Sequence, residues 1–172
     1  WDSLLPESLE VTGIDIASLR GSAKLDDGDW VWKDASAKIR SGSTKDVYDV
    51  MLAGGEISTP ISLVDKMTLH TAKGRYTGNR FYLLESEFGV LENGLMIAEG
   101  DFGIEDGIWQ IRGEVSGARI QELIAEDWKR RFMGPLDLSF EVTGKPDTES
   151  RLTGHLRIRD GILTALPLLD KI

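Results

Sequence analysis

The sequence predicts a mainly β protein: an antiparallel meander of hairpins that forms a curled sheet or groove (a half-barrel), with one amphipathic α-helix. A ten-residue pattern of glycine, alternating apolar residues and Asp-Gly occurs at 21–30, 100–109 and 154–163. Turn signals recur along the chain about every 8–12 residues, as in all-β domains. The 172 residues include 19 Gly and only 5 Pro, a balance that favours a turn-rich domain over disorder. We therefore expect a single β-rich domain over 1–172.

Each copy of the repeat predicts a two-residue hairpin, because Asp-Gly between alternating apolar residues favours a type I′ turn. This turn fixes which residues face each other across the two strands. In the copy at 100–109, the pairs would be Ile104 with Trp109, Phe102 with Ile111, and Asp101 with Arg112. In the other two copies, they would be Leu25 with Trp30, Ala23 with Trp32, Ile158 with Leu163, and Leu156 with Ala165. Every hairpin would thus have one apolar face.

The remaining strands follow from apolar alternation between Gly, Asn and Pro signals. From the N-terminus they are expected at 8–16, 19–25, 30–38, 46–53, 67–71, 80–87, 89–91, 95–99, 136–142 and 152–160, with the second repeat at 100–115. Pro167 suits the first position of a further helix.

One segment departs from the β pattern. Its apolar residues recur at helical spacing, and Gly134-Pro135 would end it. They are Ile120, Leu123, Ile124, Trp128 and Phe132. The spacing predicts an amphipathic α-helix over 118–132 that caps one end of the sheet, with a gate or a partner-docking helix as the alternative.

Composition excludes several classes of function. The net charge of -9 and the pI near 4.7 argue against nucleic-acid binding, which needs clustered Lys and Arg. The absence of cysteine excludes disulfides and thiolate zinc sites. No apolar run is long enough to span a membrane as a helix. The chain begins at Trp1, so we expect it to be a fragment of a longer protein.

Residues for chemistry are few. His70 and His155 alternate with apolar neighbours, which places both on polar strand faces. Asp26, Asp27 and Asp29 resemble part of a calcium loop but lack its ligand order and terminal Glu, so hairpin turn chemistry explains them better. We therefore expect no catalytic residues, no metal site and no cofactor.

The segment from about 75 to 172 resembles the C-terminal region of AsmA-like proteins, the superfamily that includes TamB-like bacterial envelope proteins. The resemblance is carried by GPLDLSFEVTG (134–144), LTGHLRIRDGIL (152–163), LPLLDKI (166–172) and GIWQIRG (107–113). It implies a long periplasmic protein, anchored to the inner membrane by an N-terminal segment missing here. It also implies a β groove that conducts phospholipid and supports outer-membrane homeostasis, with adjoining β segments of the parent chain as neighbours.

The leading hypothesis is a non-enzymatic AsmA-like segment whose apolar groove shields lipid acyl chains. The residues expected to face the lipid are Phe102, Ile104, Trp109, Ile111, Leu136, Leu138, Phe140, Val142, Leu156 and Ile158. One alternative is a structural or adhesion β domain with a closed core, which would bind a protein or a glycan through its loops. A second alternative is a carbohydrate-active enzyme with two carboxylates in a cleft.

Overall fold

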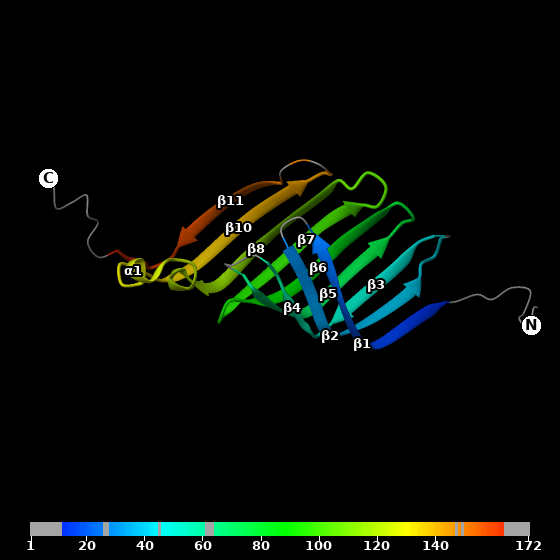
Figure 1. Cartoon of the computed structure of the whole chain (residues 1–172), viewed down its shortest axis with the longest axis horizontal. Coiled ribbons are helices and arrows are strands. Elements are labelled where there is room, and N and C mark those ends of the chain that lie inside the picture. Colours follow the sequence, from blue (N-terminus) through cyan, green and yellow to red (C-terminus); the bar gives the residue numbers. More distant parts are fainter. Residues whose placement is uncertain are drawn as a thin grey trace, which may run out of the picture.

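The fold is mainly β, as predicted: one ten-stranded antiparallel sheet contains almost all of the secondary structure (Figure 1). The structure is a computed structural model that describes residues 12–25, 28–44, 46–60, 64–146, 148 and 150–163. The strands of the large sheet are β1 (Gly13–Leu25), β2 (Gly28–Ser41), β3 (Tyr48–Ala53), β4 (Glu56–Ser58), β5 (Lys66–Tyr76), β6 (Arg80–Val90), β7 (Gly94–Gly103), β8 (Trp109–Arg119), β10 (Pro135–Gly144) and β11 (Arg151–Ile158).

The order of strands in the sheet is that of a meander, β1-β2-β3-β5-β6-β7-β8-β10-β11, with β4 paired to β2 and β5. Short elements lie between β8 and β10 and after β11. They are η2 (Ile120–Glu122), α1 (Glu126–Lys129), β9 (Phe132–Met133) and β12 (Ile162–Leu163), and β9 and β12 form a separate two-stranded sheet.

β3 and β4 behave as one strand with a break at Gly54-Gly55. Ser36 pairs with Ala53 and Lys33 with Glu56, so both halves keep one register against β2. Gly54 and Gly55 have φ of 69° and 99°, in the region that favours glycine. A Cβ on Gly55 would also lie 2.7 Å from the Ala35 backbone nitrogen. The break therefore needs glycine, and it interrupts the sheet between β2 and β5.

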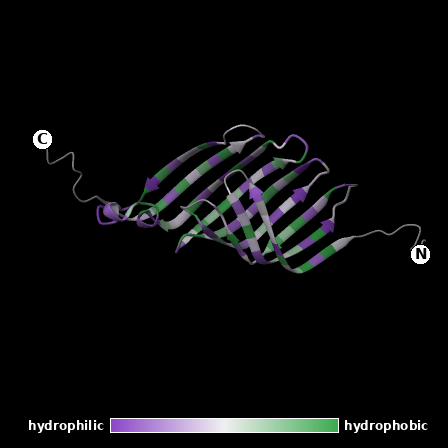
Figure 2. Ribbon diagram, in the orientation of Figure 1, coloured by the Kyte–Doolittle hydropathy of each residue, from purple (hydrophilic) through white to green (hydrophobic). Residues whose placement is uncertain are grey.

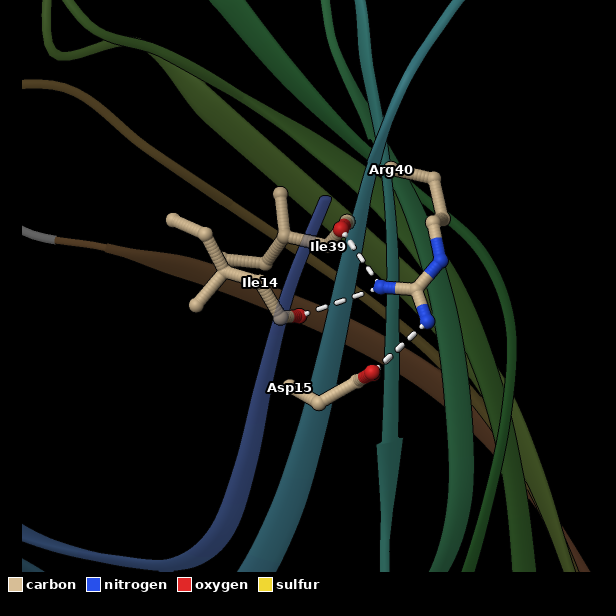
Figure 3. Close-up of polar contacts among 4 residues, drawn as sticks. All are labelled: Ile14, Asp15, Ile39 and Arg40. Carbon is tan, nitrogen blue, oxygen red and sulfur yellow. Dashed lines mark hydrogen bonds and ion pairs between the residues drawn. The ribbon is translucent and has the colours of Figure 1, made fainter. Parts of the chain in front are cut away.

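Alternation along the strands gives the sheet one apolar face and one polar face, visible as alternating colours in Figure 2. The polar face carries cross-strand ion pairs, namely Arg40–Asp15, Lys33–Glu56, Lys73–Glu85, Arg75–Asp49, Arg80–Asp101 and Arg112–Glu99. Arg40 also donates to the carbonyl oxygens of Ile14 and Ile39, which joins β1 to β2 (Figure 3). Ion pairs therefore link neighbouring strands across the polar face.

The apolar face carries two buried clusters. In one, Val90, Val115, Ala118, Ile120 and Leu136 pack together near the end of the sheet where η2 and β9 lie. In the other, Leu19, Leu52, Ile57, Leu83 and Phe88 pack against Ala35, Leu69 and Ala72. The core thus lies on a single side of the large sheet.

The α-helix predicted over 118–132 is wrong for most of its length. β8 continues to Arg119, which pairs with Pro135, and the Ile120 N–H donates to the Gly134 carbonyl at 3.1 Å. A 3₁₀ turn, one turn of α-helix and β9 follow. Strand pairing with β10 overrides the helical period, and the apolar residues reach the same core without a continuous helix.

The hairpin at 100–112 forms with a different register from the predicted one. Phe102 pairs with Trp109 and Glu99 with Arg112, a shift of two residues. A type I′ turn needs positive φ at both central residues. Positive φ occurs at Gly107 (62°) but not at Asp106, whose carboxylate instead accepts the Ile108 N–H at 2.9 Å. The loop is therefore longer than the predicted two residues. Because side chains alternate between faces with a period of two, a register shift of two keeps each residue on its predicted face.

The first and third repeats also differ from the prediction. In the first, Leu25 pairs with Gly28 and Ala23 with Trp30, again a shift of two. In the third, Ile158 pairs with Leu136, whereas Leu163 pairs with Phe132 of β9 rather than with Ile158. The predicted third hairpin is therefore not formed. Some predicted features lie outside the described residues, namely Asp26, Asp27, Ala165, the strand portion at 8–11 and the helix after Pro167.

Candidate functional site

The candidate site is the apolar face of strands β6 to β11. The register of β7, β8, β10 and β11 places most of the predicted lipid-facing residues on this one face. They are Phe102, Trp109, Ile111, Leu136, Leu138, Phe140, Val142, Leu156 and Ile158. Ile104 is not among them, because it lies in the loop after β7 and its N–H donates to the Asn79 carbonyl at 2.8 Å.

Accessibility changes along this face. Leu136 is fully buried at 0% exposure, in the cluster near η2 and β9. Ile111 is 37% exposed and Phe102 44%, and on the edge strand Leu156 is 48% and Leu152 68% exposed. One end of the face is thus filled by the protein's own side chains. The part near Phe102, Ile111 and β11 is accessible to a ligand.

Aromatic rings on this face lie across glycines of the neighbouring strand. A Cβ on Gly113 would come within 2.9 Å of the Phe140 ring, and a Cβ on Gly144 would come within 2.5 Å of the Trp109 indole nitrogen. The rings occupy the space that side chains at these glycines would need. This close packing explains why strands here carry glycine at apolar positions.

Ser86 is a buried polar residue on the apolar face, and its hydroxyl has a hydrogen-bond partner. Ser86 is fully buried, and its hydroxyl donates to the Ala98 carbonyl at 2.6 Å. Its hydrogen-bonding capacity is therefore met inside the sheet. Ser86 offers no polar group to a ligand.

A second apolar feature lies at the covered end, where sequence reasoning identified the residues but not their arrangement. Ile120, Ile124, Ala125, Trp128, Phe132 and Ile158 line a hollow of about 440 Å³. The Trp128 and Phe132 rings are 5.7 Å apart, and the Arg131 guanidinium lies 5.4 Å from the Trp128 ring. The helical spacing of four of these residues was the only signal in the sequence. The fold adds Ile158 from β11.

Both histidines lie away from the apolar face. His70 sits on the polar face with its Nδ1 3.0 Å from Glu87 Oε1, and His155 is exposed on β11. Among the described residues, no three His, Asp or Glu side chains gather as a metal site would require. In the same part of the chain, no helix has the length and apolarity needed to cross a bilayer.

Comparisons with protein-family models, with curated proteins and with solved structures find no match to this chain.

Proposed function

We propose that the exposed part of the apolar face binds the acyl chains of phospholipid, and that the chain is a non-enzymatic segment of an AsmA-like periplasmic protein. Its role would be phospholipid transport or outer-membrane homeostasis. One observation supports the proposal above all: Phe102, Ile111 and Leu156 share one face and are 44%, 37% and 48% exposed. Large apolar side chains exposed together on one face mark binding sites in soluble proteins.

The energetics of such a site need no specific polar contact. Each CH₂ group removed from water contributes about 0.8 kcal/mol, so an acyl chain lying along the face gains affinity with its length. The polar face, with its ladder of ion pairs, stays in water. A sheet with these two faces separates lipid from solvent by geometry alone.

The surroundings of the segment belong to the same proposal. Adjoining β segments of a longer parent chain would extend the groove. A membrane anchor N-terminal to this segment would hold the protein at the inner membrane, and the periplasm would be its compartment. The protein would contact the membrane only through that anchor.

The test uses two isoleucines on neighbouring strands that face opposite ways. Ile111 of β8 lies on the apolar face, 37% exposed, and Ile97 of β7 lies on the polar face, 53% exposed. Purified chain is incubated with phospholipid vesicles, separated from them, and its retained lipid is measured by mass spectrometry. Ile111→Lys should lower the retained lipid at least fivefold, whereas Ile97→Lys should leave it unchanged.

The matched pair separates the effect of the face from that of an added charge. Thermal unfolding of both variants checks that each remains folded. Wild-type protein that retains no lipid, or equal losses in the two variants, would exclude lipid binding by the apolar face.

A further inference from the structure

In the part of the chain that the structure describes, no strand pairs with the outer edge of β11. β11 is the last strand of the large sheet, and seven of its eight residues are exposed, all but Ile158. Ile162 and Leu163 do not fold back along it, because they pair with β9 instead. Within the described part of the chain, nothing pairs with this edge. The hairpin that would have covered it is the one that does not form.

The edge is regular enough to accept a strand. The pairing of β11 with β10 runs from Arg151 to Ile158 without a register break. The Arg159 N–H points inward, donating to the Pro135 carbonyl at 3.0 Å. Because backbone groups alternate in an antiparallel ladder, Leu152, Gly154, Leu156 and Ile158 present their N–H and C=O groups outward. Unpaired groups of this kind are a template for another strand.

The opposite edge of the sheet differs. The pairing of β1 with β2 breaks between Ile16 and Leu19 and again between Leu19 and Gly21. Irregularities of this kind make an edge strand less able to pair with an added strand. The two edges are therefore not equivalent, and β11 is the better acceptor.

Charge indicates what kind of strand fits. Arg151 and Arg157 project from β11 on the polar face, and within the described residues neither makes an ion pair. Asp137, which stands opposite Arg157 in the ladder, instead pairs with Arg159 at 2.6 Å. On the inner strands, arginines such as Arg75 and Arg112 each pair with a carboxylate of the adjacent strand. The edge thus has two arginines placed for carboxylates that an added strand would bring.

We propose that the outer edge of β11 binds an extended segment of another polypeptide, in which apolar residues alternate with Asp or Glu. Apolar residues of the segment would continue the apolar face beside Leu152 and Leu156, and its acids would meet Arg151 and Arg157. A second copy of β11 fits this edge poorly. If two copies paired antiparallel about Gly154, Arg151 of each copy would lie opposite Arg157 of the other. Like charges directly opposite each other are destabilising.

The probe is a fluorescently labelled peptide with the sequence PLDLSFEVTG, that of Pro135–Gly144. It has the required alternation, and β10 already pairs with β11 through eight residues. The control peptide carries Lys in place of both acids, D137K and E141K. Fluorescence anisotropy with the full chain should show at least fivefold tighter binding of the acidic peptide. The protein variant R151E/R157E should reverse this preference, and a gain of binding to the lysine peptide cannot come from misfolding.

Amide hydrogen exchange locates the peptide. The acidic peptide should slow exchange at Leu152, Gly154 and Leu156, whose N–H groups point outward, and change the inward amides of Thr153 and His155 much less. Equal binding of the two peptides, or unchanged exchange at the outward amides, would overturn the proposal. Light scattering that shows a dimer of the wild-type chain, lost in R151E/R157E, would also overturn it and assign the edge to a second copy.

Discussion

The indole of Trp32 on β2 lies against Gly21 on β1, so close that a Cβ on residue 21 would sit 2.6 Å from a ring carbon. The two residues are direct partners in the β1–β2 ladder. The ring occupies the space that a side chain at residue 21 would need. This arrangement ties the first strand to the second through packing as well as hydrogen bonds.

Gly21→Ala should therefore destabilise the protein, although replacing glycine by alanine in a strand ordinarily stabilises it. Overpacking of this kind costs about 1–3 kcal/mol in the free energy of unfolding. Urea denaturation measures the change. In a Trp32→Ala background the same substitution should be neutral or stabilising, because the clash is removed. Identical effects in the two backgrounds would contradict the packing argument.

Ser86 should contribute through its single hydrogen bond. Its hydroxyl donates to the Ala98 carbonyl at 2.6 Å and is fully buried. Ser86→Ala leaves that carbonyl without its side-chain donor, so we expect a loss of about 1–2 kcal/mol in unfolding free energy. Ser139→Ala, at an exposed position of β10, should change it by less than about 0.5 kcal/mol. Urea denaturation measures the unfolding free energy of both variants. A Ser86→Ala variant as stable as Ser139→Ala would contradict this prediction.

Alternation in the sequence predicted the fold class and the faces, because a period of two determines which side of a sheet each residue meets. It did not predict the register of the hairpins. Asp106-Gly107 does turn the chain, but the Asp106 carboxylate accepts a backbone N–H and the loop lengthens. The alternation does not determine whether an aspartate adopts positive φ or accepts such a bond. The helix at 118–132 failed for a related reason, since pairing of Arg119 with Pro135 is a long-range contact.

Cysteine cross-linking should distinguish the observed register from the predicted one. The chain contains no cysteine, so introduced pairs have no background. Glu99 and Arg112 are direct partners, and Glu99→Cys/Arg112→Cys should oxidise readily. Asp101 is diagonal to Arg112, at about 7–8 Å, beyond most disulfide Cα separations. Asp101→Cys/Arg112→Cys should react much more slowly, as followed by thiol titration, and faster reaction of this second pair would favour the predicted register.

The pKa of Lys33 should depend on Glu56. The Lys33 ammonium donates to the Glu56 carboxylate at 2.9 Å, and this hydrogen bond, with the attraction between the charges, raises the pKa of Lys33 above its ordinary 10.5. A raised pKa in the folded state adds stability below the unfolded pKa, and this is lost as the pH rises through the folded value. Glu56→Gln should lower the Lys33 pKa in an NMR titration. Glu85→Gln removes the partner of Lys73 and should leave the Lys33 pKa unchanged. Equal changes of the Lys33 pKa in the two variants would indicate a general charge effect.

The candidate site could be predicted only in part. Alternation placed Leu136 and Leu156 on one face, and both do lie there. It could not show that Leu136 is covered by Ile120 and its neighbours while Leu156 is exposed on an edge strand. Coverage depends on how the segment after β8 packs, and that segment does not form the long helix that its spacing predicts. A residue's face follows from local sequence, whereas its accessibility follows from the whole fold.

Leu136 and Leu156 should therefore respond differently to truncation, although they point to the same side of neighbouring strands. Leu136 is 0% exposed, so Leu136→Ala leaves a cavity and should cost about 2–5 kcal/mol in unfolding free energy. Leu156 is 48% exposed, and Leu156→Ala should cost less than about 1 kcal/mol but lower the lipid retained after vesicle incubation. Urea denaturation and lipid mass spectrometry on the same two variants separate these roles. A Leu136→Ala protein of near wild-type stability, or unchanged lipid retention in Leu156→Ala, would show that burial does not divide this face into a packed part and a binding part.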